Sequence, residues 1–174
     1  LARLPASRGF KCGLRVRLRC GGGARFDRLG AKALGFYVAA PDEVAARLME
    51  LIVGRCMGTW VTGAATGAGV AATAQSMWSD AESSIRQIGA GLDEALLPDG
   101  LRSFSGHRLM QEFAALPQRL QFFEFGDLGR RLAQVNAIEC DLVLFFDRAF
   151  AGLEAQVDDA SLAFRREGVN SPEP

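Results

Sequence analysis

The chain has 174 residues, of which 49% are hydrophobic and 23% are charged, with 20 basic and 20 acidic side chains. This composition is typical of a globular domain and excludes a disordered chain, which combines low hydrophobicity with high net charge. The balanced charge argues against nucleic acid or an anionic membrane as the main partner, because both require a basic field. No stretch reaches the ~20 consecutive apolar residues of a membrane-spanning helix, so we expect no direct membrane insertion.

Metal and cofactor sites are not indicated either. The four cysteines are Cys12, Cys20, Cys56 and Cys140. None of their spacings is the gap of about two to four residues with which one turn offers two thiolates to zinc. His107 is the only histidine. We therefore predict no metal, no cofactor, and four buried or incidental thiols.

The first predicted element is a strand over residues 14–20, where apolar side chains alternate with arginines. Arg15, Arg17 and Arg19 share one face of this strand. Such a stripe fits either an anion-binding β domain or the half-solvated face of an antiparallel sheet, and the balanced charge favours the second. A second strand is predicted over residues 34–39.

An amphipathic helix is expected to begin at Pro41 and to end at Gly54 or Gly58. Its apolar face consists of Val44, Leu48, Leu51 and Ile52. Residues 57–74 are then rich in Gly, Ala and Thr. The glycines of residues 63–69 resemble a nucleotide-binding loop, but no Gly-Lys-Ser/Thr motif follows them, so we predict a flexible loop without a ligand.

A second amphipathic helix is predicted over residues 106–116, and Pro117 ends it. Its apolar residues are Leu109, Met110, Phe113 and Leu116. We expect this apolar side to pack on an aromatic strand predicted over residues 120–125. The polar residues that remain for solvent or a partner chain are Arg108, Gln111 and Glu112.

Alternation predicts another strand over residues 138–146, and a short element is expected to begin at Asp158. Clusters of strands separated by short helices predict an α+β fold with mainly antiparallel strands and short packed helices. We divide the chain into a β-rich subdomain over residues 1–95, with one helix and a Gly/Ala-rich loop, and an α+β subdomain over residues 96–164. Residues 165–174 are predicted to form a disordered tail.

Two groupings of polar residues suggest catalysis, and neither is specific. His107 with Ser103 or Ser105 suggests a small hydrolase, but no Gly-x-Ser-x-Gly turn accompanies them. Glu139 and Asp141 share one face of a strand and could form a metal or acid/base pair, although a solvent-facing strand edge is the simpler interpretation without a partner histidine. We therefore predict no catalytic residues and no enzyme activity.

A longer, ordered pattern in the second half resembles a known family. It comprises Leu92-Asp-Glu-Ala-Leu-Leu-Pro98, then Arg102-Ser-Phe-x-Gly106-x-Arg-Leu-Met-Gln-Glu-Phe113, then Pro117 and Phe122-Phe123-Glu-Phe125-x-Asp-Leu128. This pattern resembles the TssF family, also called VasA or ImpG, of the type VI secretion baseplate. With the strands and helix upstream, the resemblance covers most of residues 13–163. The chain departs from the family pattern at Asp99, His107 and Ala114.

Family members are several times longer than this chain, so the resemblance implies the middle portion of a larger baseplate protein. It implies a structural role: with TssG, TssE, TssK and a second TssF copy, the family forms wedges that nucleate a contractile sheath. The implied location is the cytoplasm, at the inner face of the bacterial inner membrane. The candidates for the partner interface are Arg102, Phe104, Arg108, Gln111 and Glu112.

Overall fold

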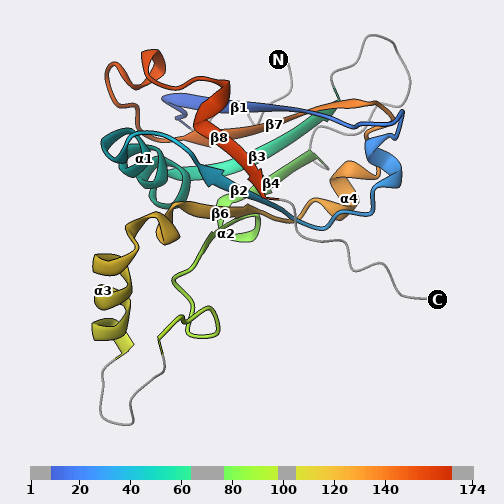
Figure 1. Cartoon of the computed structure of the whole chain (residues 1–174). Helices are drawn as coiled ribbons and strands as arrows, with labels where there is room; N and C mark the ends of the chain where they lie inside the picture. Colours follow the sequence, from blue (N-terminus) through green and yellow to red (C-terminus); the bar gives the residue numbers. More distant parts are fainter. Residues whose placement is uncertain (1–8, 64–76, 98–104, 166–174) are drawn as a thin grey trace, which may run out of the picture.

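The computed structural model describes residues 9–63, 77–97 and 105–165. These ranges form antiparallel sheets and short helices (Figure 1). The strands are β1 (Cys12–Arg19), β2 (Leu34–Val38), β3 (Cys56–Gly63), β4 (Trp78–Asp80), β5 (Ile85–Ile88), β6 (Phe122–Phe125), β7 (Glu139–Phe146) and β8 (Leu162–Arg165). The α-helices are α1 (Asp42–Met49), α2 (Ala81–Ser84), α3 (Ser105–Ala115) and α4 (Gly129–Leu132). Shorter turns are the π-helical η2 (Glu50–Gly54) and the 3-10 turns η1 (Phe26–Arg28), η4 (Pro117–Gln121), η5 (Leu153–Ala155) and η6 (Asp159–Ser161).

Strands from distant parts of the chain alternate in both sheets. Sheet A has the order β1-β7-β3-β4, and sheet B has the order β5-β6-β2-β8. Every pairing between these strands is antiparallel, so the predicted α+β class is confirmed. Each sheet contains strands from both sides of residue 95, and the division into subdomains there stays a prediction. Figure 1 shows α1 and α4 at opposite ends of the sheets, while α3 projects away from them.

The hydrophobic core lies between the two sheets. Alternation along each strand sends every second side chain inward. Sheet A contributes Val61, Cys140, Leu142, Leu144 and Phe146, and sheet B contributes Phe36, Val38, Phe123 and Phe125. The predicted helix is confirmed as α1, which continues as η2 to Gly54. Its four predicted apolar residues are all buried in this core.

The central strand β3 has a composition that does not indicate a strand. It lies between β7 and β4 in sheet A. Gly58 and Gly63 interrupt the alternation of apolar residues that would indicate a strand. Gly58 is required because the ring of Trp78 lies over it, so that a Cβ there would overlap the indole. The predicted flexible loop over residues 63–69 lies outside the described residues except for Gly63, which ends β3.

A buried arginine joins the two sheets. Arg131 in α4 has no exposed surface, and its guanidinium donates to the carbonyls of Asp127 at 2.6 Å and Gly126 at 2.7 Å. It also donates to the Thr59 hydroxyl in β3 at 2.9 Å and lies 5.4 Å from the centre of the Phe125 ring. Burial lowers the pKa of Arg131 to about 10. These hydrogen bonds therefore hold the charged guanidinium of Arg131 in the core between the two sheets.

We expect Arg131→Ala to lower the free energy of unfolding by about 3–5 kcal/mol, because it leaves buried acceptors without a donor and opens a cavity. Arg130→Ala changes the exposed neighbour and is expected to cost no more than about 0.5 kcal/mol. Denaturant titrations of both variants measure the difference. Equal losses would show that Arg131 does not join the sheets.

Candidate functional site

The buried and the exposed side of α3 are the reverse of what the sequence predicts. Its buried side carries Arg108 and Glu112, each 4% exposed, whereas Met110, Phe113 and Leu116 are 72%, 54% and 48% exposed. The expected packing of the apolar side on the aromatic strand β6 is therefore wrong. The expectation that Arg108 and Glu112 face solvent is wrong for the same reason. We call Met110, Phe113 and Leu116 the α3 apolar face.

The buried carboxylate of Glu112 explains this orientation. It accepts the backbone N–H groups of Leu96 at 3.0 Å and Leu97 at 2.9 Å. It also accepts the guanidinium of Arg108 at 3.2 Å and that of Arg119 in η4. Backbone N–H groups need an acceptor when they are withdrawn from water. Glu112 must therefore face the segment 89–97, and the apolar residues of α3 face outward.

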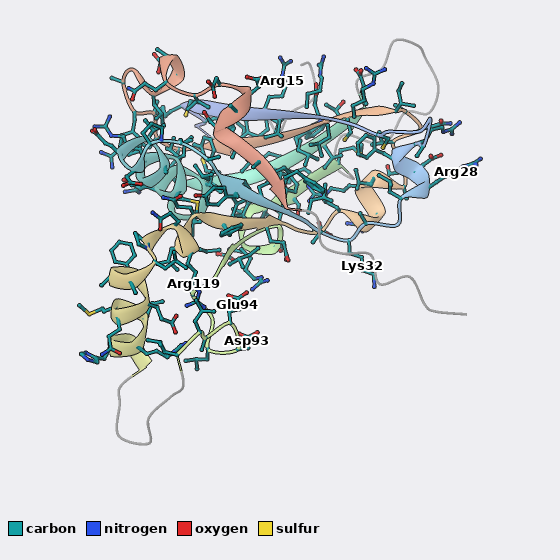
Figure 2. The ribbon with its side chains drawn as sticks, in the orientation of Figure 1. Arg15, Arg28, Lys32, Asp93, Glu94 and Arg119 are labelled. Carbon is teal, nitrogen blue, oxygen red and sulfur yellow. The ribbon has the colours of Figure 1, made fainter. Side chains whose placement is uncertain are left out.

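A second carboxylate, Glu94, fixes the same segment to sheet B. It accepts the N–H groups of Gly89 at 2.6 Å and Gly91 at 3.2 Å. Its side chain also binds Arg86 of β5 at 2.9 Å. The guanidinium of Arg119 donates to the backbone carbonyl of Glu94. Figure 2 shows Glu94 and Arg119 close together beside α3.

These interactions shift the acidity of Glu94. Burial raises the pKa of its carboxyl, but the N–H of Gly89, the guanidinium of Arg86 and the N–H of Gly91 together hold that pKa below the ordinary value of 4.5. The charged form of Glu94 is thus favoured in the folded chain. Together, Arg86, Glu94, Arg108, Glu112 and Arg119 form a group that we call the polar clamp.

The polar clamp gives the family-like pattern a structural explanation. Its acidic residue before Ala-Leu-Leu and its arginine and glutamate four positions apart hold α3 and the segment 89–97 together. The spacing of Arg108 and Glu112 is visible in the sequence as an i, i+4 pair. Their burial is not visible, because such pairs usually lie on the surface of a helix.

The remaining interface candidates are placed differently. Gln111 is exposed on α3, and Arg102 and Phe104 lie outside the described residues. His107 is also exposed, and its Nε2 atom lies 3.2 Å from the side-chain nitrogen of Gln111. Both serines of the hydrolase hypothesis have side chains outside the described part of the chain. The structure therefore brings no described nucleophile to this histidine.

The arginine stripe and the carboxylate pair belong to one arrangement. β1 and β7 pair so that Arg17 lies opposite Asp141 and Arg19 opposite Glu139. Arg17 donates to both oxygens of Asp141, at 2.7 and 2.9 Å, which lowers the pKa of that carboxyl. Arg19 lies 3.9 Å from Glu139. The two acids lie on the central strand β7 and not at a sheet edge, and their pairing with arginines argues against both an anion site and an acid/base pair.

The buried thiols of Cys56 and Cys140 offer little reactivity. Burial raises the pKa of Cys56 to about 11 and that of Cys140 to about 12, so both stay protonated at neutral pH. In the described ranges, no three His, Cys, Asp or Glu side chains are grouped to hold a metal ion.

No helix in those ranges is long and apolar enough to cross a membrane.

Comparison with known proteins connects this geometry to one family. Residues 1–165 match the family model described as type VI secretion system, TssF. The chain is 38% identical over 165 residues to the type VI secretion system component TssF1 of Pseudomonas aeruginosa strain PAO1, an alignment that covers 93% of this chain and 25% of that protein. The chain thus spans about a quarter of the length of this curated relative.

A solved structure shows the same fold. The chain is similar to part of a cryo-electron microscopy structure of the type VI secretion system TssK-TssF-TssG baseplate subcomplex, with a TM-score of 0.62 at 16% sequence identity. The match covers 87% of this chain and 27% of that chain.

Glu94→Gln is expected to lower the free energy of unfolding by about 1–3 kcal/mol at neutral pH, because it removes charged hydrogen bonds. A carboxyl whose pKa is depressed by folding stabilises the fold above its unfolded pKa, and that contribution is lost as the pH falls through the folded pKa. The wild-type chain should therefore lose more stability than Glu94→Gln as the pH falls below 4.5. Asp93→Asn is the control, since Asp93 is exposed. A larger loss in Asp93→Asn would contradict the polar clamp.

A pair of Phe→Ala variants tests the orientation of α3. Phe123 is 1% exposed, and Phe123→Ala should cost about 3–5 kcal/mol of unfolding free energy. Phe113→Ala should cost less than about 1 kcal/mol in the isolated chain, because its ring is mostly solvated. Thermal and denaturant unfolding measure both. A core-like loss at Phe113 would place the apolar side of α3 inward after all.

Proposed function

Since this chain belongs to the type VI secretion system TssF family, we propose that it is a structural component of the secretion baseplate, acting as part of a TssF-like subunit. The observation that carries this proposal is the 38% identity to TssF1 over 93% of the chain. In this role the chain supplies shape-specific contacts during assembly, and it catalyses no reaction.

The proposed partners are other baseplate proteins. TssK and TssG are named in the solved subcomplex that shares this fold, which supports them as partners here. TssE and a second TssF copy are proposed from the family resemblance alone. Together they would form wedges that nucleate the contractile sheath, in the cytoplasm at the inner face of the inner membrane.

The geometry supports a packing surface on α3 within the assembled TssF-like subunit. The charged residues of α3 are Arg108 and Glu112, and both are turned into the polar clamp. The exposed side of α3 therefore carries no charge, and it includes an aromatic residue and a methionine. Protein interfaces are depleted of charge at their centres and enriched in these two residue types. We propose that Gln111 lies at the border of this surface and that Arg108 and Glu112 act indirectly, by holding the helix in place.

The proposal is tested with a chimera in which residues 1–165 of this chain replace the matching quarter of P. aeruginosa TssF1. Co-expressed with TssG, TssE and TssK, the chimera should elute with them in size-exclusion chromatography. TssF1 without that quarter should fail to do so. A folded chimera that elutes alone would contradict the baseplate role.

A further inference from the structure

The described part of the chain leaves the α3 apolar face largely open to solvent. Met110, Phe113 and Leu116 lie on the side of α3 opposite the polar clamp, and Figure 1 shows α3 projecting from the sheets. We propose that another segment of the same family-length TssF polypeptide packs on this face, before any separate baseplate protein binds. This inference rests on the proposed function only for its assignment of the chain to a TssF-like subunit.

A covering segment would stabilise α3. The helix has 11 residues, and isolated helices shorter than about 12–15 residues are marginal in water. Its inner side is held by charged groups, and buried ion pairs contribute little net stability because their desolvation opposes their attraction. Packing of an apolar face normally stabilises a helix of this length. In α3 that face points outward, so the packing must come from elsewhere.

The chemistry of the surface defines the covering segment. The covering segment does not bind through complementary charge, since the exposed side of α3 offers no charged side chain. Leu96 and Leu97, in the segment that Glu112 holds on the other side of α3, are exposed apolar residues as well. The covering segment therefore presents an uncharged, mainly aliphatic surface, as in the core of a domain or of a permanent interface.

The length of the relatives favours a segment of the same polypeptide. This chain matches 25% of TssF1 and 27% of the solved chain, so a family-length protein contains about three times as much additional polypeptide. A segment tethered in this way is present at an effective concentration of about millimolar. It would cover the apolar face from synthesis onward, whereas a face left open until subunits meet would favour aggregation.

Oxidation of the native methionine tests this inference without a mutation. Met110 is exposed, while Met49 and Met77 are buried in the core and serve as internal references. Hydrogen peroxide converts exposed methionine to its sulfoxide, and peptide mass spectrometry gives the rate at each position. In the isolated chain, Met110 should be oxidised much faster than either reference. In the chimera without partner proteins, its rate should fall by about tenfold or more.

Other outcomes overturn the inference. Protection of Met110 only after TssG or TssK is added would assign the face to a separate subunit and leave the proposed function intact. Protection in the isolated chain that rises with concentration would assign the face to a second copy. If the chimera does not fold, this chain co-expressed with the remaining portions of TssF1 as separate polypeptides replaces it. Absence of protection in every form would show that no segment covers the face.

A charge placed on the face gives a second measurement. Phe113→Glu should leave the melting temperature of the isolated chain nearly unchanged but lower that of the chimera by several degrees. Gln111→Glu is the matched control, since it adds the same charge to the same helix outside the apolar face. Equal shifts in the chimera for the two variants would contradict the inference. A chimera that fails to bind TssG and TssK but still protects Met110 would contradict the proposed function alone.

Discussion

The buried carboxylate of Glu112 determines which surface this domain presents. Two backbone amides of the segment 89–97 and two guanidinium groups converge on it. Leaving such groups buried and unsatisfied carries a large cost in free energy. The helix therefore keeps Glu112 inside. Its apolar face then has to point outward. The exposed apolar surface of α3 is thus a consequence of internal hydrogen bonding.

Arg131 likewise fixes an orientation through buried hydrogen bonds, in this case between the two sheets. Its acceptors are backbone carbonyls of the turn after β6 and the Thr59 hydroxyl of β3. Asp127 in this turn has a positive φ of 51°, a conformation that Asp tolerates better than most residues. One cation thus connects a strained turn of sheet B with the central region of sheet A. In both places a charge in the interior fixes an orientation that apolar packing alone would leave open.

The sequence predicts elements with strong periodicity and misses those defined by tertiary contacts. The alternation around Arg15, Arg17 and Arg19 identifies β1, and the apolar spacing after Pro41 identifies α1. Strand β3 is not predicted, because its Gly58 is required by the overlying ring of Trp78, which lies twenty residues away in the sequence. For α3 the periodicity identifies two faces correctly but does not say which is inside. The acceptors that decide this question belong to another segment of the chain.

The position of β7 in sheet A has a consequence for synthesis on the ribosome. β7 pairs with both β1 and β3, so β1, the first strand of the described residues, stays unpaired until its partner, which begins at Glu139, has been synthesised. Contacts between residues so distant in sequence form slowly, and unpaired strands are prone to aggregate meanwhile. The three arginines of β1 are well suited to this interval, because charged side chains discourage pairing with the wrong strand. β1 thus presents a charged face throughout the interval before β7 is made.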